Sequence, residues 1–437
     1  MKKTLLLAGG LVSTLGFAAQ PVFQPIGSSF TTGGSPNQRA LSTSTNNPAA
    51  SFLMVNSEED DHFRFGILGP GGFGYELGQV DSLEDKINDL TDELDKKDLS
   101  ISDINVVKDK ANSIVSQLGK DATFKMMMAG QIPLMPFIYK HSKYGAFTFD
   151  MSLSAEGKGS VLDDDVTPLV NPLTQTFQLQ TTTSIYVKNA VDLNFGLGYS
   201  RDIWTNHMGM LVGGAKVNVH SITLGKSLVS LSGATDDKAG DVFTDALKDN
   251  QKTTVGAGLD LGLIWTANNY QIGATLTNVN EPKFDYASLA DDCASKTGAA
   301  QDNCYAARNF AGKGRIKLNE SHVMERQLTL DSAVSLSNRQ WTLAGSVDLF
   351  ETHDPVGDLY QWGTVSASYY GDSNWIPGAR IGYRKNMTGS ELSYVTGGLT
   401  LFKRLNLDLA YGLESIDAGG TAVPRSLFFS AGIESAF

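Results

Sequence analysis

Apolar and polar residues alternate along much of the chain after residue 145. One face of the final segment, residues 426–437, is apolar and carries Leu427, Phe429, Ala431 and Ile433. Phe428 is the bulky apolar exception on the other face. Alternation with a period of two is typical of a β-strand with one apolar side. The pattern alone leaves two alternatives for that side, a protein core or lipid.

The number and spacing of these segments favour lipid. About thirteen occur, and many approach the ~9–11 residues that a tilted strand needs to cross a bilayer. Tight links at 267–269, 337–339 and 403–404 alternate with long connections at 225–252, 279–326, 352–361 and 416–425. A β-sandwich of this size would divide into two domains, whereas outer-membrane barrels have short turns at one end and long loops at the other. The sequence therefore predicts an all-β protein, a transmembrane antiparallel β-barrel.

One connection does not fit this alternation of short and long links. Residues 156–177 are long but fall on the side of the short links. We expect one further strand near residues 167–180, which would give an even total of about 14 strands.

Two regions lack the strand pattern. Residues 81–118 place apolar side chains at helical spacing and predict two amphipathic helices with one acidic face, within an insertion at 81–121. The apolar stripes of the two helices pack against each other or against the barrel. The insertion is either a helical hairpin without a partner or a docking site for another protein. Residues 20–80 are rich in Ser, Thr, Gly, Asn and Pro, a composition that fits either disorder or a plug inside the barrel.

The N-terminus predicts export. Residues 1–18 have the basic, apolar and small-residue layout of a signal peptide, with cleavage after Ala18. No later apolar stretch reaches 18 residues. The expected domains are the signal peptide (1–18), a plug and first strand (19–80), the helical insertion (81–121) and the barrel (122–437).

Charge and motifs limit the chemistry. The 437 residues carry a net charge of -12, which disfavours nucleic-acid binding. Acidic runs at 58–61 and 163–165 favour solvated loops over a weak Ca²⁺ site. The six histidines lack the HExxH spacing, and no GxSxG or P-loop motif occurs, although a triad assembled across strands stays open. We expect no enzyme activity, cofactor or metal.

Cys293 and Cys304 lie in the longest predicted external loop. In an oxidising compartment we expect them to form a disulfide that stabilises the loop by about 3 kcal/mol. Aromatic residues near predicted strand ends also fit the girdles of a membrane barrel. These residues are Trp204, Trp265, Trp362, Trp375, Tyr199, Tyr369, Tyr370 and Tyr411.

Three stretches carry a family resemblance: "ALSTSTNNPAASF", "YQIGATLTNVNEPKF" and "GARIGYRKNMTGSELSYVTGGLTLFKRLNLDLAYGLE". Together they resemble the outer-membrane barrels related to the long-chain fatty acid transporter FadL. Within that group the chain is most similar to the barrel-type TraF proteins of conjugal plasmid transfer, which differ from the thioredoxin-like TraF. The helical stretch is not part of the fatty-acid transporter pattern and suits the TraF type better.

The resemblance implies a barrel of about 14 strands in outer-membrane lipid. It implies an N-terminal plug with an Asn47–Pro48–Ala49 turn, and a terminal signal, Phe429, Ile433 and Phe437, that the barrel-assembly machinery recognises.

Two functions follow from this resemblance. The first is a non-enzymatic envelope component of conjugal transfer that contacts another envelope protein through residues 81–121. The alternative is a FadL-like channel for a hydrophobic ligand that enters past residues 40–50. In either case we expect Leu409 to face lipid and Asp408 to face a wet lumen that tolerates Arg at this position.

Overall fold

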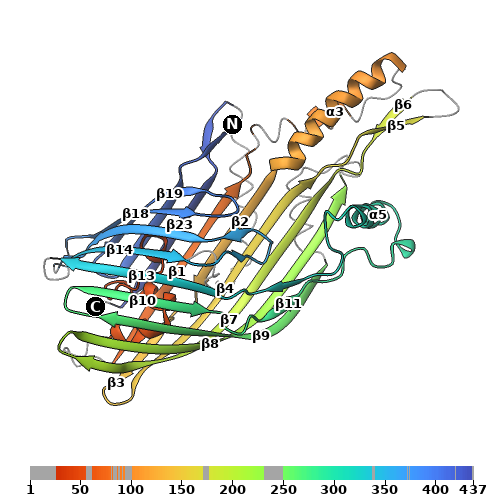
Figure 1. Cartoon of the computed structure of the whole chain (residues 1–437). Coiled ribbons are helices and arrows are strands. Elements are labelled where there is room, and N and C mark those ends of the chain that lie inside the picture. The colour runs from red at the N-terminus through yellow and green to blue at the C-terminus, as the bar shows by residue number, and fades with distance from the viewer. Residues whose placement is uncertain are drawn as a thin grey trace.

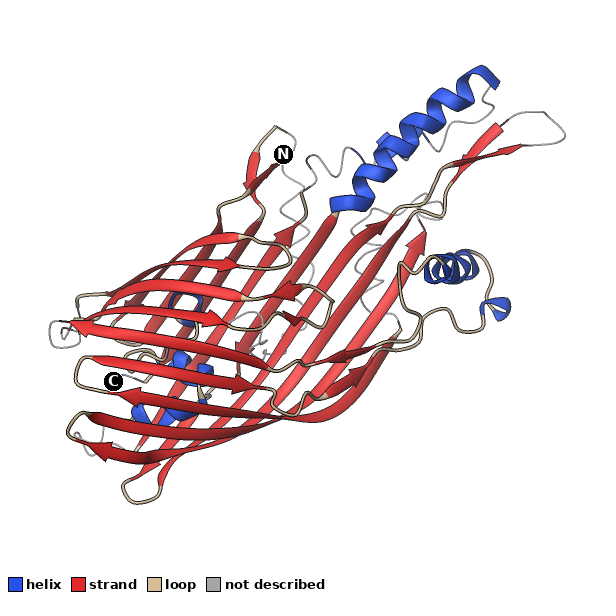
Figure 2. Cartoon of the chain, in the orientation of Figure 1, coloured by secondary structure: helices blue, strands red, loops and turns tan. Residues whose placement is uncertain are grey.

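The wall of the molecule is a single closed antiparallel sheet (Figures 1 and 2). The computed structural model describes residues 26–55, 62–79, 101–170, 177–230, 250–336, 340–371, 375–418 and 420–435, with a few positions between 81 and 93 and residue 373. The wall strands are β1 (Phe63–Leu77), β2 (Thr123–Gln131), β3 (Phe137–His141), β4 (Gly145–Leu162), β7 (Ser184–Asn206), β8 (Gly209–Ser230), β9 (Gln251–Thr266), β10 (Tyr270–Thr277), β13 (Gln327–Leu336), β14 (Trp341–Asp348), β17 (Trp362–Tyr369), β18 (Gly378–Asn386), β19 (Ser393–Leu401), β20 (Leu405–Gly412) and β23 (Ser426–Glu434).

The ring closes where the first strand, β1, pairs with the last, β23. β2 and β3 occupy one position in the ring, since both pair with β1 on one side and β4 on the other. Residues 132–136 separate these two strands. The wall therefore has 14 positions, and the prediction of an antiparallel barrel of about 14 strands is confirmed.

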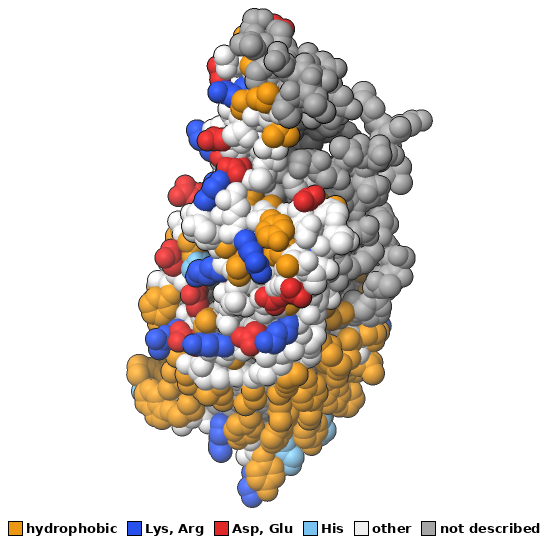
Figure 3. Space-filling view, turned by 90° about the vertical axis from the view of Figure 1, so that its right-hand side faces the viewer, with side chains coloured by type: hydrophobic (Ala, Val, Ile, Leu, Met, Phe, Trp, Pro, Cys, Tyr) orange, Lys and Arg blue, Asp and Glu red, His pale blue; other side chains and the backbone are white. Residues whose placement is uncertain are grey.

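Alternation along each strand separates a lumen face from an apolar outer face. On β20, Leu409 is 43% exposed and its neighbour Asp408 only 2% exposed. Phe429 on β23 is likewise exposed. On the face shown in Figure 3, hydrophobic side chains form an apolar belt toward one end of the molecule, bordered by charged residues. A belt of this extent on the outside of a closed barrel is the surface that meets lipid.

The strands differ greatly in length around the ring. β7 and β8 have 23 and 22 residues, whereas β10, β14, β17 and β20 have eight each. Since ~9–11 residues suffice to cross a bilayer, the long strands project far beyond it. Figure 1 shows β4, β7 and β8 rising past the rest of the wall. We call this projecting part of β4, β7 and β8 the extension.

The strand expected near residues 167–180 lies outside the barrel. Residues Thr167–Val170 (β5) and Phe177–Gln180 (β6) form a separate two-stranded sheet beside the extension. The alternation of short and long links is instead restored by the tight link at 207–208, which divides the segment into two strands, β7 and β8. With that link included, the connection after β4 falls among the long ones.

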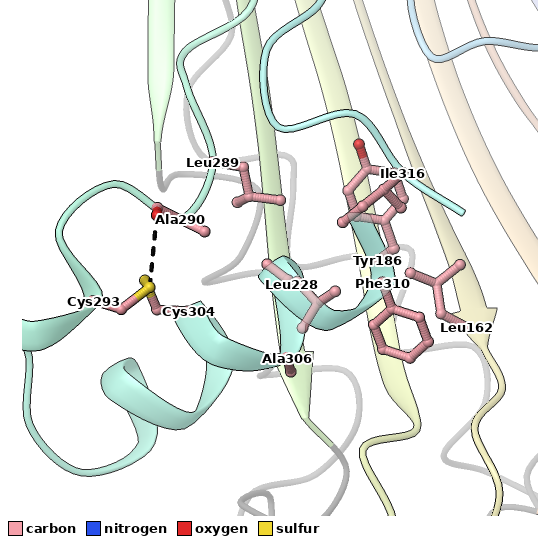
Figure 4. Packing of buried hydrophobic residues seen from close by; sticks show 11 residues of the cluster. Leu162, Tyr186, Leu228, Leu289, Ala290, Cys293, Cys304, Ala306, Phe310 and Ile316 are labelled. Carbon is pink, nitrogen blue, oxygen red and sulfur yellow. Dashed lines mark hydrogen bonds between the residues drawn. A yellow bond between two sulfur atoms is a disulfide. The ribbon is translucent and has the colours of Figure 1, made fainter. Parts of the chain in front are cut away.

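Helices cover both faces of the extension. The remaining elements are α1 (Ser29–Thr32), η2 (Leu41–Asn46), η3 (Pro48–Leu53), α3 (Ile101–Asp121), β11 (Lys283–Asp285), η6 (Cys293–Ser295), α5 (Ala299–Gly312), β12 (Ser321–Val323), β15 (Thr352–His353), β16 (Leu359–Tyr360), β21 (Ser415–Asp417) and β22 (Ala422–Pro424). Phe310 of α5 packs with Leu162, Tyr186 and Leu228, on the lumen side (Figure 4). α3 packs with Val161, which points to the opposite side of β4.

The apolar stripe of α3 is covered within the chain. Leu118 and Val115 pack with Leu90, from the segment before the helix, and with Leu179 of β6. The exposed face of α3 carries mixed charge, with Asp103, Asp109, Lys110 and Lys120. Residues 94–100 and most of 82–91 lie outside the described part of the chain. No helix among the described residues is long and apolar enough to cross a bilayer.

Candidate functional site

The lumen is closed at two levels. Residues 26–55, which we call the plug, fold into α1, η2 and η3 inside the barrel. At the end with the long connections, residues 352–360 form a hairpin of β15 and β16 that lies over the lumen. We call this second closure the mouth hairpin. The two closures are attached to the wall by different kinds of contact.

The Asn47–Pro48–Ala49 turn attaches the plug to β8, β9 and β10. The Asn47 side chain accepts a hydrogen bond from the Ala49 amide (2.9 Å) and donates to the carbonyls of Leu263 (3.3 Å) and Ala274 (3.4 Å). Glycines form the wall beneath this turn. A β-carbon at Gly262 would overlap the Asn47 amide oxygen, and one at Gly214 would overlap the Pro48 carbonyl. Close approach of the turn therefore requires glycine at both positions.

Neutral hydrogen bonds hold the rest of the plug around the ring. The Gly27 amide donates to Ser430 Oγ (2.9 Å) and the Gly34 amide to Ser346 Oγ (2.9 Å). Thr148 Oγ1 on β4 donates to Ser51 Oγ (2.6 Å). These three contacts reach β23, β14 and β4, so the plug is attached on several sides of the lumen.

Two buried charged groups of the wall also contact the plug. Glu434 accepts from the Leu41 amide (2.6 Å) and lies 3.7 Å from Arg64. Asp408 accepts from Thr31 Oγ1 (3.3 Å) and pairs with Arg380 at 3.0 Å, with both charged side chains at most 1% exposed. The expectation of a wet lumen at Asp408 is therefore wrong, because Arg380 and the plug enclose the carboxylate.

The structure explains why Phe428 is the apolar exception on the polar face of the final strand. It points inward, is 3% exposed, and packs against Phe30 of α1 with ring centroids 5.9 Å apart. Tyr394 lies on its other side at 6.2 Å. A bulky residue that breaks the polar face of a barrel strand was the available sequence signal for this plug contact.

Ion pairs attach the mouth hairpin to the wall on the far side. Lys125 of β2 contacts Asp354 and also Asp358 at 3.3 Å, and Lys158 of β4 contacts Asp358. The hairpin joins β14 to β17, which lie six or seven positions around the 14-membered ring from β2 and β4. It therefore spans the whole diameter of the barrel. Burial opposes ionisation of Asp358, but Lys125 and Lys158 lower its pKa below the usual value.

The connection between β10 and β13 contributes to the same closure. Tyr286 donates a hydrogen bond to the Pro355 carbonyl of the mouth hairpin. Glu320 pairs with Lys188 (3.1 Å) and Lys226 (3.3 Å) on the wall. His322 belongs to this connection and is buried, and burial, with the nearby Lys188 and His353, lowers its pKa to about 3.

The other residues singled out in the sequence take no part in the two closures or lie outside the described chain. Cys293 of η6 and Cys304 of α5 form a disulfide (Figure 4). Phe429 is on the lipid face and Ile433 is half-buried. Ala18 and Phe437 lie outside the described residues, as does the acidic run at 58–61.

The second acidic run is paired with basic side chains of the loop after α5. Asp163 contacts Arg315 (2.6 Å) and Asp164 contacts Lys313 (2.5 Å). These carboxylates therefore serve a loop contact. Within the described ranges no group of His, Cys, Asp or Glu is arranged to hold a metal ion.

Two of the proposed girdle aromatics are lumen residues. Trp362 is 8% exposed and its ring lies 3.8 Å from the Arg384 guanidinium. Tyr370 is 7% exposed and accepts a hydrogen bond from Arg380 (2.8 Å). Trp204 and Trp265 do lie on the outer face, 5.7 Å apart near the β7–β8 turn.

The closed ring, the apolar belt and the filled lumen define this protein as a plugged transmembrane β-barrel. Residues 44–348, most of the chain, match the family described as "F plasmid transfer operon, TraF, protein". The chain belongs to this family, as the sequence resemblance predicted. No curated protein sequence matches it significantly.

Several solved barrels are similar to the chain at low identity. A FadL homologue from Pseudomonas aeruginosa is 12% identical, with a TM-score of 0.43 and coverage of 97% of this chain and 100% of that one. The Pseudomonas putida toluene transporter TodX is 11% identical, with a TM-score of 0.38 over 96% and 98%. A TodX monoaromatic hydrocarbon channel mutant is 12% identical, with a TM-score of 0.46 over 91% and 95%.

Proposed function

We propose that this protein is a non-enzymatic outer-membrane component of a conjugal transfer apparatus, and that its extension contacts another envelope protein. The observation that carries the proposal is the one-sided projection of β4, β7 and β8, with α3 and the β5–β6 hairpin beside it. A barrel that only crossed the membrane would not need strands of twice the required length. Membership of the TraF family supports this assignment.

The orientation follows from the connections. Short turns join β7 to β8, β9 to β10 and β19 to β20 at one end of the barrel, and long connections lie at the other. In outer-membrane barrels the short turns are periplasmic. The extension then faces the outside of the cell, and residues 1–18 supply the expected export signal.

The exposed polar face of α3 is the proposed contact surface. The apolar stripe of the helix is covered by the chain, so a partner meets Asp103, Asp109 and Lys120, together with the exposed Val106. A photoactivatable residue at Val106 should crosslink to an envelope protein in cells that carry the transfer apparatus. The matched control is Leu263, an exposed residue of the belt on β9, which should crosslink to lipid.

Removal of the helical insertion tests the function. Leu77 pairs directly with Phe124, and the Gly78 amide donates to the Thr123 carbonyl (2.8 Å), so a tight turn can replace residues 79–121 without moving either strand. We expect this variant to keep heat-modifiable gel mobility and to lower plasmid transfer by at least about tenfold. A factor of ten corresponds to the loss of about 1.4 kcal/mol of binding free energy. Normal transfer by a correctly folded variant would refute the proposal.

One observation favours a second function, a channel for hydrophobic small molecules. The pairing of β1 shifts between Gly66 and Gly71, beside the interruption at 132–136. A small cavity there is lined by Leu41 of the plug and by Pro70 and Pro136 of the wall. Vesicles containing the protein should then take up a hydrophobic probe faster than empty ones. Ser42→Phe, which fills this cavity, should abolish the difference.

A further inference from the structure

Four lysines stand side by side on the lumen wall beneath the mouth hairpin. Lys125 of β2 pairs in register with Lys158 of β4, Lys158 with Lys188 of β7, and Lys188 with Lys226 of β8. Residues paired directly across strands point to the same face. We call these four residues the lysine row.

The lysine row places like charges next to each other. Neighbouring strands are about 4.8 Å apart, so the row extends over roughly 15 Å. Like charges directly opposite on adjacent strands are destabilising. The row lies beyond the lipid belt, since Leu193, the exposed apolar residue of β7 nearest to Lys188, is five residues further along the strand.

The negative charges that compensate the row come mostly from loops. Asp354 and Asp358 of the mouth hairpin contact Lys125 and Lys158. Glu320, from the connection between β10 and β13, contacts both remaining lysines. Glu156, a wall residue, lies 3.7 Å from Lys125.

An aromatic ring completes the coverage of the row. The Tyr286 ring lies 4.5 Å from the Lys188 ammonium and 5.5 Å from that of Lys226. The face of an aromatic ring attracts cations. Every group described here except Glu156 belongs to a connecting segment, and these segments can leave without any change in the strand pairing of the wall.

We propose that the lysine row is a binding site for an extended oxyanion ligand with several phosphate or carboxylate groups, and that the loop carboxylates occupy it in the closed state. The carboxylates of Asp354, Asp358 and Glu320 contact the four ammonium groups of the row. The anionic groups of such a ligand would have to take similar positions along the row. A multivalent anion would replace them, and the mouth hairpin would then lose its attachment to β2 and β4. This site is separate from the α3 surface and does not depend on the proposed function.

Opposite substitutions at the two sides of the site test the proposal. With the full-length protein in detergent and inorganic tripolyphosphate as the probe, Asp354→Asn/Asp358→Asn should bind at least about tenfold more tightly than the unaltered chain, because the internal competitor is lost. Lys158→Gln/Lys188→Gln should bind at least about tenfold more weakly. Monophosphate, which cannot span the row, should bind all three proteins weakly.

A matched control separates this site from general electrostatics. Asp163→Asn/Asp164→Asn removes the same charge from a loop whose carboxylates pair with Arg315 and Lys313. It should leave tripolyphosphate binding unchanged. Equal effects of the two aspartate pairs, or equal binding of mono- and tripolyphosphate, would overturn the proposal.

Folding of each variant is checked by heat-modifiable gel mobility. If the double aspartate variant does not fold, Asp358→Asn alone serves, since that side chain is 27% exposed and contacts two members of the row. Its affinity for tripolyphosphate should still rise, and an unchanged affinity would refute the site.

Discussion

The plug and the mouth hairpin both close the lumen, but they do so with different chemistry. The plug is held by close packing on Gly214 and Gly262 and largely by neutral hydrogen bonds. The mouth hairpin is held on the far wall by ion pairs with Lys125 and Lys158. Neutral packing responds little to salt or pH, whereas a partly exposed ion pair such as Lys158–Asp358 responds to both. We therefore expect the outer closure to respond more strongly to solution conditions than the inner one.

The largest expected effect comes from Asp408→Arg, in the wall under the plug. The substitution removes the partner of Arg380 and places a second cation beside it in a site with almost no exposure to water. Breaking a buried pair costs about 3–5 kcal/mol. The free energy of unfolding in lipid vesicles should fall by at least this amount. Stability equal to that of the unaltered chain would show that the lumen is wet here after all.

Leu409→Arg should have a somewhat smaller effect for a different reason. Leu409 is exposed on the lipid face of the same strand. An arginine there costs about 2–4 kcal/mol near the bilayer midplane. This loss should occur in vesicles but disappear in a soluble detergent that wets the side chain, whereas the loss for Asp408→Arg should persist in both. Identical behaviour of the two variants would contradict the assignment of faces.

Gly262→Val should detach the plug turn. Because a β-carbon at this position overlaps the Asn47 side chain, overpacking should cost about 1–3 kcal/mol. Protease cleavage within residues 26–55 should increase. Gly397→Val is the matched control, since the nearest atom to its β-carbon is 3.9 Å away. Cleavage that rises equally in both variants would indicate general destabilisation.

Acid should loosen the outer closure and spare the inner one. His322 has a pKa of about 3 in the folded protein and 6.5 when unfolded, so it is buried in its neutral form. Because only the unfolded chain takes up a proton just below pH 6.5, the free energy of unfolding decreases as the pH falls below this value. At pH 5 the loss is about 2 kcal/mol. Proteolysis of the connection at 278–326 should rise between pH 7 and 5, and His322→Gln should remove this dependence. An equal rise in proteolysis of the plug between pH 7 and 5 would contradict the proposed difference between the two closures.

The sequence predicted the features that depend on a repeating pattern. Alternation along β20 separated Leu409 from Asp408, and the short and long links indicated a barrel. Pairing across the lumen has no such period. Arg380 and Asp408 are 28 residues apart, and nothing in the pattern of their strands indicates that they exclude water.

The lysine row was missed for a related reason. Its members are each ordinary polar-face residues, and their alignment depends on the registers of three strand pairs. Trp362 and Tyr370 were placed in the lipid girdle because aromatic residues near strand ends fit either face. Only the parity of each residue within its strand distinguishes the two faces, and an error of one residue in a strand boundary reverses it.

The seam between β1 and β23 has a consequence for biogenesis. Phe428 on the last strand packs on Phe30, which precedes the first strand, and directly faces Gly74 across the seam. The two ends of the chain therefore become structured together, and residues 26–55 have to be inside before the ring is sealed. A nascent protein that closed early would leave its N-terminal segment outside a hollow cylinder. The Phe30–Phe428 contact thus links the placement of the plug to the closure of the seam.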